Sequence, residues 1–301
     1  NTAVTPGSDA AVVRVRHTKK ALAMTTDCNA RYIYLDPYVG GQIAVSEAAR
    51  NIVASGGIPI GITDCLNFGS PSDPESYWEL DQSVQGIAQA CERFDTPVIS
   101  GNVSMYNETD GRSIYPTPMI GMVGLIEDVA QITTQSFKTA GDAVYLVGDT
   151  GDDFAGSELQ KLRGQMTPVG QLNFNLDAEV ANQRLVQQAI RQDLLQSAHD
   201  LSEGGLGVAL AEALFEYQLG FTGQTELTNS QLFSETQSRF IVSVQPKDQT
   251  EFEALAGKQA VLLGRTTDQD AVQLVTADGQ LTARSSELKA TFGGALGCLM
   301  K

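Results

Sequence analysis

Residues 96–108 read TPVISGNVSMYNE and join a short apolar run to a cluster of small and polar residues. The run Val98-Ile99 predicts a buried strand that breaks into a loop. Gly101 permits a close backbone approach. Asn102 and Ser104 then place an amide oxygen and a hydroxyl at the carboxyl end of this strand, where open sheets commonly bind ligands. The segment therefore predicts a binding loop, with a simple Gly-Asn turn as the alternative.

Residues 58–69, IPIGITDCLNFG, predict a second strand that ends in a carboxylate. Ile58, Ile60 and Ile62 alternate as in a strand and deliver Asp64 to its end. Two strand ends that carry Asp and Gly-Asn together indicate a phosphate and metal site. Asp64 by itself could equally cap a helix or a turn, so neither segment alone decides between structure and function.

The composition is that of a globular protein with room for two domains. The chain has 301 residues, of which 42% are hydrophobic and 19% charged,. No apolar run reaches the ~20 residues that span a bilayer, and the N-terminus lacks a signal-peptide pattern. The four cysteines have no C-x-x-C spacing, which predicts free thiols in a reducing cytoplasm,. The chain begins with Asn1 rather than Met, which fits an excised piece of a longer protein as well as a processed protein.

The formal net charge of -16 restricts the classes of partner. Such a charge argues against nonspecific binding to nucleic acids or to anionic membranes. It does not exclude phosphorylated small ligands, because glycine-rich loops, helix N-termini and bound magnesium hold phosphate without many basic side chains. We therefore expect neither a nucleic-acid nor a membrane partner.

Hydrophobic patterns predict a mixed α and β chain that we divide into domains 1–135 and 136–301. In the first domain they predict further strands at 10–16, 21–26, 31–35 and 119–126, and helices at 42–55 and 80–91,. In the second domain they predict strands at 143–147, 240–244, 261–263 and 272–275, and helices at 177–195 and 205–219,. Gly56-Gly57 is the expected stop of the first helix.

Two polar loops carry further candidate ligands. In residues 199–207, HDLSEGGLG, either Asp200 or Ser202 caps the next helix, or the free N–H groups of that helix receive a phosphate,. His199 has no second histidine nearby in the sequence, so we expect it to make a structural hydrogen bond rather than to bind a metal. Asp27, in the polar stretch TDCN, either coordinates magnesium or forms an Asx-turn,.

Five segments, in this order, resemble the C-terminal half of phosphoribosylformylglycinamidine synthase, in the aminoimidazole ribonucleotide synthetase-like superfamily. These segments are residues 26–31, 56–59, 63–69, 100–108 and 199–205. The resemblance covers most of the chain, and the Gly-Asn-Val-Ser and Thr-Asp-Cys-Leu-Asn-Phe-Gly segments are its specific parts. It implies an α+β fold in two domains. The first is an N-terminal α/β sandwich whose sheet pairs with a partner, and the second is an α/β C-terminal domain.

The resemblance also implies an activity. The family is an ATP-dependent ligase of purine biosynthesis that converts formylglycinamide ribonucleotide, ATP and glutamine-derived ammonia to formylglycinamidine ribonucleotide, ADP and phosphate. Its subunit is about twice as long as this chain, so the implied partners are the N-terminal half of the same polypeptide, a glutaminase subunit and a small third subunit. The alternatives are a non-catalytic nucleotide-binding scaffold half and another ATP-dependent member of the superfamily.

Matching the family's site residues to this sequence gives four positions. Asp64 and Gly101 match positions that contact ATP. Asn102 matches a magnesium ligand, so Mg²⁺ is the implied metal. Ser104 matches a contact to the substrate. Carboxylate, amide and hydroxyl oxygens are the hard donors that magnesium and polar phosphate oxygens require.

Asp27, Asp200 and Glu203 are candidates for an auxiliary nucleotide site. The family's catalytic histidine belongs to the first half of the subunit, so neither His17 nor His199 inherits that role. The resemblance therefore implies that no catalytic residue lies in this chain, and that the chain alone is inactive.

Overall fold

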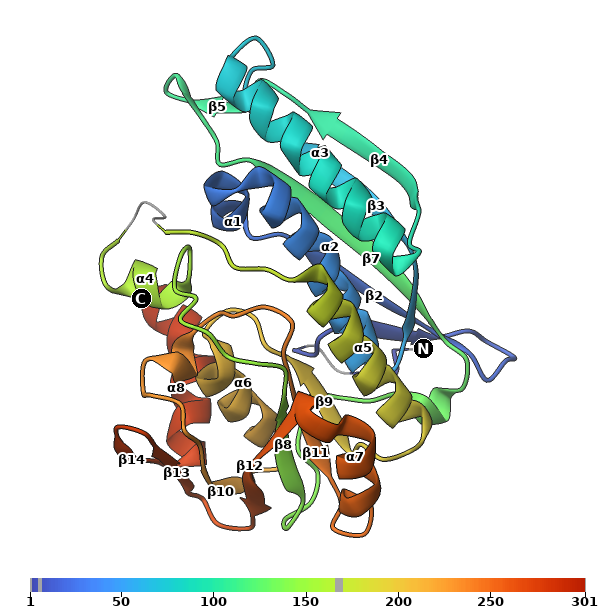
Figure 1. Ribbon diagram of the computed structural model, residues 1–301, viewed down its shortest axis with the longest axis vertical. Helices are drawn as coiled ribbons and strands as arrows, with labels where there is room; N and C mark the ends of the chain where they lie inside the picture. Colours follow the sequence, from blue (N-terminus) through green and yellow to red (C-terminus); the bar gives the residue numbers. More distant parts are fainter. Residues whose placement is uncertain (1, 5–6, 166–169, 301) are drawn as a thin grey trace.

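The computed structural model describes residues 2–4, 7–165 and 170–300, which form two layered domains stacked one on the other (Figure 1). Asn1 lies outside the described residues. The first domain is built on a mixed five-stranded sheet with the order β1-β2-β7-β3-β4. Its strands are β1 (Ala11–Arg14), β2 (Ala21–Asp27), β3 (Ile58–Asn67), β4 (Val98–Ser104) and β7 (Thr117–Ile126), and the hairpin β5 (Glu108–Thr109) and β6 (Arg112–Ser113) projects from it.

Helices α2 (Pro37–Ala54) and α3 (Pro74–Phe94) pack over one face of this sheet (Figure 1). The apolar stripe predicted for the first helix meets the inward side chains of the strands in one buried core. Of the stripe predicted for the second helix, Ile87 and Cys91 join this core, whereas Val84 is exposed. Both helices begin earlier than predicted, because Asp36 and Asp73 cap their first turns and a proline follows each cap,. The two predicted helices are thus confirmed and extended.

Gly56 ends helix α2 as expected. Its φ of 88° lies in the left-handed region, and a Cβ at this position would lie 2.1 Å from the carbonyl oxygen of Gln131. The Gly56 N–H donates to the carbonyl of Val53, and the Gly57 N–H donates to that of Ile52. This pair of bonds is a Schellman motif, which satisfies the last carbonyls of the helix.

The second domain contains a seven-stranded sheet with the order β14-β13-β10-β12-β8-β11-β9. Its strands are β8 (Ala143–Val147), β9 (Ser197–Asp200), β10 (Gly220–Gln224), β11 (Phe240–Val244), β12 (Ala260–Thr267), β13 (Val272–Thr276) and β14 (Gly279–Ala283). Its helices are α4 (Glu158–Leu162), α5 (Leu176–Arg191), α6 (Gly205–Leu214), α7 (Gln249–Ala256) and α8 (Ser285–Leu299), and its 3₁₀ turns are η2 (Gln231–Phe233) and η3 (Gly257–Gln259). A further 3₁₀ turn, η1 (Val129–Gln131), follows β7 in the first domain.

Strands β8 and β11 are buried throughout, since helices cover both faces of this sheet. Tyr145 and Val147 pack with α5 and α7 on one face, whereas Val144 and Leu146 pack with α6 on the other. Their continuous apolar sequences are typical of strands covered on both sides. The predicted strands of this domain are confirmed. Six elements of this domain, α4, β9, β10, α7, β14 and α8, were not predicted.

Residues 31–35, predicted as a strand, form helix α1 (Ala30–Leu35) instead. The side chain of Asn29 accepts a hydrogen bond from the Arg31 N–H at 3.1 Å and starts the helix,. Tyr32 and Ile33 are buried. The aromatic and β-branched composition favoured a strand, but the cap and this burial outweigh it.

The prediction of a loop at residues 199–207 is also partly wrong, because a strand ends and a helix begins within this segment. His199 and Asp200 end strand β9, which pairs with β11. Helix α6 begins after Gly204, whose φ is 79°, and no side chain caps it. Neither Asp200 nor Ser202 therefore acts as the predicted cap.

Strand β4 is an exposed edge strand rather than the buried strand predicted from Val98-Ile99. Val98 is 46% exposed and Ile99 73% exposed. The strand continues to Ser104, so Gly101 and Asn102 lie within it and not in a loop. An apolar run predicts a strand that some surface covers, but within the described residues nothing covers this one.

We expect the chain to self-associate through this edge and the uncovered face of the first sheet. Ile60 and Met24 are 48% and 36% exposed on the same sheet, and exposed apolar edge strands pair readily,. Light scattering across a wide concentration range should show dimers or larger species that Ile99→Lys reduces. Val261→Lys, at an exposed valine of the second domain, is the control and should leave association unchanged. A monomer at every concentration contradicts the prediction.

Candidate functional site

Asp64 on β3 lies directly opposite Gly101 on β4. Because side chains alternate along a strand, Asp64 shares the helix-covered face with Ile62 and Leu66, which pack in the core,. A Cβ on Gly101 would lie 2.0 Å from Asp64 Oδ1. Glycine therefore leaves the space that this carboxylate occupies. Burial raises the pKa of the Asp64 carboxyl above its ordinary value.

Asn102 and Ser104 face the open side of the sheet, opposite Cys65 and Asn67 on β3,. The Asn102 side-chain nitrogen lies 3.5 Å from Ser104 Oγ. The amide oxygen of Asn102 accepts no hydrogen bond from any residue that the structure describes, and the residue is exposed. This oxygen is therefore free to bind a ligand.

The four residues thus occupy neighbouring positions on two adjacent strands, but not one face. The prediction that Asp64 stands at a strand end is wrong, because β3 continues to Asn67. Since β4 is the edge of the sheet, both faces meet along its free side. There, the backbone groups of β4 that point away from β3 have no neighbouring strand within the described residues,. Asp64 and Gly101 therefore lie on the helix-covered face beside this edge, and Asn102 and Ser104 lie on the open face,.

The donor set suits magnesium only as part of a larger site. Among the described residues, no group of three or more His, Cys, Asp or Glu side chains is arranged to hold a metal ion. Magnesium commonly takes one or two protein ligands and completes its shell with water and phosphate oxygens. The unbonded amide oxygen of Asn102 fits the role of one such ligand.

A second cluster surrounds Arg50, which is fully buried between the domains. Its guanidinium donates to Asp200 Oδ1 at 2.6 Å, to Glu179 Oε2 at 2.8 Å and to Gln237 Oε1 at 2.8 Å. Arg50 lies on α2 of the first domain, whereas its three partners belong to the second domain. Burial by itself lowers the pKa of Arg50, but the carboxylates of Asp200, Glu179 and Glu47 outweigh it and raise this pKa. The guanidinium stays charged.

Asp27 and Glu203 lie at the same cluster, so the structure brings the three auxiliary candidates into one region. Asp27 accepts hydrogen bonds from Thr25 at 2.8 Å and from Asn51 at 3.0 Å. Burial raises the pKa of Asp27 to about 6, and the charge of Glu203 acts in the same direction. Burial also raises the pKa of Asp200 to about 7. Of Asp27, Asp200 and Glu203, only Asp200 accepts a hydrogen bond from Arg50.

His199 has the structural role expected from the sequence. Its Nδ1 lies 2.7 Å from Asp9 Oδ1, and its Nε2 lies 3.3 Å from Glu212 Oε2. Although burial lowers the pKa of His199, the two carboxylates raise it to about 10. The imidazolium therefore links the N-terminal segment, β9 and α6 at neutral pH.

Arg50, Glu47 and Glu179 were not predicted from the sequence. A signal was available, because Arg50 stands in the apolar run AARNIVA of helix α2. A charged side chain on a buried helix face requires buried partners. The sequence does not say which carboxylates these are, since Glu179 and Asp200 come from distant segments.

Two family models match the chain and cover most of it. The model described as "AIR synthase related protein, N-terminal domain" matches residues 7–126, and the one described as "AIR synthase related protein, C-terminal domain" matches residues 139–276. The chain belongs to the AIR synthase-related superfamily. Its two-domain α+β fold, predicted from the sequence, is confirmed.

Solved structures with the same fold include PurL from Thermotoga maritima. Its complex with FGAR superposes with a TM-score of 0.79 at 16% identity, covering 96% of this chain and 48% of that chain. Its complex with ADP gives a TM-score of 0.76 at 17% identity, covering 96% and 47%. AaThiL complexed with AMPPCP and TMP gives 0.64 at 20% identity, covering 89% and 87%. This chain thus spans about half the length of the PurL chains.

Proposed function

We propose that this chain is the C-terminal half of a phosphoribosylformylglycinamidine synthase. The observation that carries the proposal is the position of the Asp64 carboxylate over Gly101, beside Asn102 and Ser104, on an uncovered edge strand. The coverage of about half of each PurL chain supports it. In this role the chain supplies one wall of a composite site, and the N-terminal half supplies the other.

Each residue then has a distinct task. Asp64 and the Gly101 backbone bind ATP along the free edge of β4. Ser104 donates or accepts a hydrogen bond with formylglycinamide ribonucleotide on the open face. Asn102 is one ligand of Mg²⁺, which when bound neutralises charge on the phosphates. The reaction transfers the γ-phosphoryl group of ATP to the amide oxygen, and ammonia then displaces phosphate. The residues of this chain bind and orient the reactants, and none acts as acid or base.

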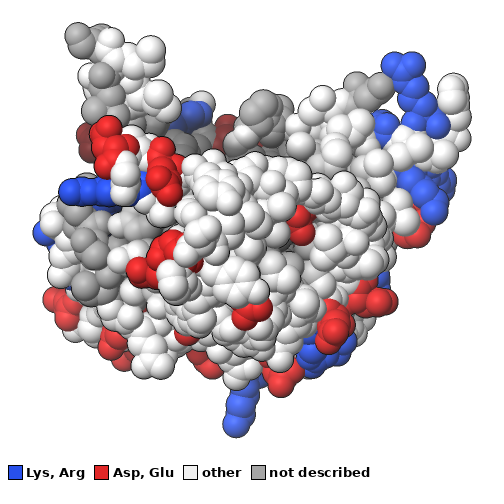
Figure 2. Space-filling model, turned by 90° about the horizontal axis from the view of Figure 1, so that it is seen from above, with Lys and Arg blue, Asp and Glu red and all other residues white. Residues whose placement is uncertain are grey.

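The proposal includes partners and a compartment. A glutaminase subunit and a small third subunit supply the ammonia, and the complex works in the cytoplasm. No nucleic-acid or membrane partner is proposed. On the face drawn in Figure 2, the coloured basic side chains form separate groups among acidic ones rather than a continuous stripe. Among the described helices, none is both long and apolar enough to cross a bilayer.

Substitution of Asn102 in the full-length enzyme tests the proposed site. We expect Asn102→Ala to lower ammonia-dependent ADP release about 10- to 100-fold, with partial recovery at high magnesium, because one metal ligand is lost. Its effect on the free energy of unfolding should stay within about 0.5–1 kcal/mol, since the side chain is exposed,. Gln85→Ala removes an exposed amide from helix α3 and is the control. Normal turnover of Asn102→Ala at limiting magnesium would mean that Asn102 has a structural role and does not bind the metal.

A second candidate function is that of a complete ATP-dependent enzyme of the same superfamily. The chain covers 92% of a chain of the HypE–HypF complex and 87% of AaThiL, so its length matches those proteins without a second half. Such an enzyme would pair two copies of this chain across the open sheet face. ATP turnover by the purified 301-residue chain, dependent on Asp64, would favour this candidate.

The Arg50 cluster bears on the scaffold alternative, in which this half holds a nucleotide structurally. The cavity lined in part by Tyr32, Glu235 and Gln237 has a volume of only about 10 Å³. A larger cavity of about 610 Å³ is bordered by Gln237 and Ser238, but Asp27, Asp200 and Glu203 do not line it. The Asp200 carboxylate already accepts a hydrogen bond from Arg50. We therefore propose that Asp27, Asp200 and Glu203 belong to a structural ion network, and the auxiliary nucleotide site stays a prediction.

A further inference from the structure

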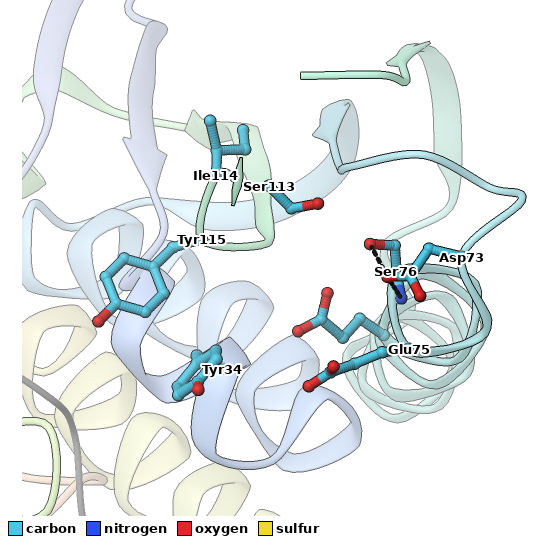
Figure 3. A pocket seen from close by; sticks show the side chains of 8 residues that line it. Tyr34, Asp73, Glu75, Ser76, Ser113, Ile114 and Tyr115 are labelled. Atoms are coloured by element: carbon cyan, nitrogen blue, oxygen red, sulfur yellow. Dashed lines mark hydrogen bonds between the residues drawn. The ribbon is translucent and has the colours of Figure 1, made fainter. Parts of the chain in front are cut away.

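A separate cavity of about 410 Å³ lies between helix α1, the start of α3 and the segment after β6 (Figure 3). Its walls carry three carboxylates, two serines, an isoleucine and two tyrosines. They are Asp73, Glu75, Ser76, Glu79, Ser113, Ile114, Tyr34 and Tyr115. Its volume lies in the range of small-molecule pockets, which is about 300–1,000 Å³.

Glu79 is the unusual member of this wall. Only 8% of its surface is exposed, yet it has no hydrogen-bond or ion-pair partner among the residues that the structure describes. Buried carboxylates are normally paired. Glu75 stands one helical turn before Glu79, where like charges destabilise a helix. Helix capping explains Asp73, which accepts from the Ser76 N–H at 3.2 Å, but it does not explain Glu79.

The aromatic wall faces these carboxylates. The rings of Tyr34 and Tyr115 lie 5.0 Å apart in an edge-to-face pair, and each residue is 41% exposed. Figure 3 shows the Glu75 carboxylate and the Ser113 hydroxyl pointing toward the space between the helix and the hairpin segment. Aromatic rings beside carboxylates are the surroundings that an organic cation prefers. A metal ion is a poorer fit, because no metal-binding group of His, Cys, Asp or Glu was found among the described residues.

We propose that this cavity binds a small organic cation with a guanidinium or primary ammonium group, paired with Glu79 and Glu75 and stacked against Tyr34 or Tyr115. This site is independent of the proposed ATP edge, because its residues come from α1, α3 and the hairpin. The cation supplies the charge that Glu79 lacks and relieves the repulsion between Glu75 and Glu79.

Calorimetric titration of the 301-residue chain with methylguanidinium and with butylammonium, at low ionic strength and about pH 8, tests this site. We expect one saturable site that Glu79→Gln weakens by about 10-fold or more, since a charged hydrogen bond is lost. Tyr115→Leu should weaken it about 2- to 5-fold through the lost cation–π contact. Glu92→Gln removes a carboxylate from the exposed C-terminal part of the same helix and should change nothing. Melting temperatures verify that each variant is folded.

The pH dependence gives a second readout. Burial, together with the charges of Glu75 and Asp73, raises the pKa of Glu79 to about 7. The other titratable groups that line the cavity are Tyr34 and Tyr115. A cation binds the ionised carboxylate, so affinity should fall as the pH decreases from about 8 to about 6. In Glu79→Gln this part of the pH dependence should disappear.

The outcomes separate the sources of the cation. Binding to the 301-residue chain but not to the full-length enzyme would mean that a Lys or Arg side chain of the first half fills the same cation site. Binding to both would identify a free cation as the ligand. Equal weakening by Glu79→Gln and Glu92→Gln, or tighter binding of Mg²⁺ than of methylguanidinium at this cavity, would overturn the proposal.

Discussion

The purified 301-residue chain is expected to form no formylglycinamidine ribonucleotide above a protein-free control, even with excess ammonia, ATP and Mg²⁺. The proposed site on β4 is an open edge that leaves Asn102 exposed, so reactants bound there are neither enclosed nor oriented from the other side. Removing members of a catalytic set commonly costs about 10⁴-fold or more in turnover. The measurement is ADP release coupled to product analysis.

Addition of the N-terminal half, expressed separately, should restore turnover and remove self-association of the chain. Both effects follow from one cause, because the first half covers the edge strand that carries the site. A matched control is the same mixture with Ile99→Lys, which should associate poorly and recover less activity. Steady turnover by the chain alone would contradict the half-enzyme proposal and favour a complete superfamily member.

The sequence predicted those parts of the fold whose pattern is local. Strand β8 is a continuous apolar run, so its sequence reveals both its type and its burial,. The period of helix α3 revealed the type of element but not all of its buried residues, since Val84 of the expected stripe is 43% exposed. The stop at Gly56 was equally local, since the hydrogen bonds that close the turn go to Val53 and Ile52 of the helix itself. The strand predicted at residues 31–35 was wrong, because the helix cap at Asn29 outweighed strand propensity,.

What the sequence could not supply was contact between distant segments. The apolar pair Val98-Ile99 predicted a strand correctly, but its exposure depends on which surface lies beside β4. Asp64 and Gly101 were each singled out, yet their contact follows from the register of β3 against β4. The division of the site between two faces of the sheet follows from the same register, and no motif reports it.

Replacement of Arg50 by methionine is expected to destabilise the chain by about 3–5 kcal/mol at neutral pH, because it leaves buried carboxylates without their cation. Arg50 bonds to Asp200 and Glu179, and both carboxylates are buried. Urea-induced unfolding, followed by circular dichroism, measures the loss. Arg93→Met is the matched control. It breaks the Arg93–Asp177 pair at 2.7 Å, whose side chains are 42% and 81% exposed, so it should cost no more than about 1 kcal/mol,.

The pH dependence of Arg50→Met distinguishes lost charge from lost packing. Burial already raises the pKa of Asp200 to about 7, and removal of Arg50 raises it further. A carboxyl group whose folded pKa exceeds its unfolded value favours folding when protonated, so its contribution to stability falls as the pH rises above the unfolded value of about 4. The variant should therefore lose more stability than the wild type between about pH 5 and pH 8. A loss that is constant over this range would mean that methionine packs poorly and that the charge of Arg50 matters little. A loss no larger than that of Arg93→Met would show that Arg50 does not hold the two domains together.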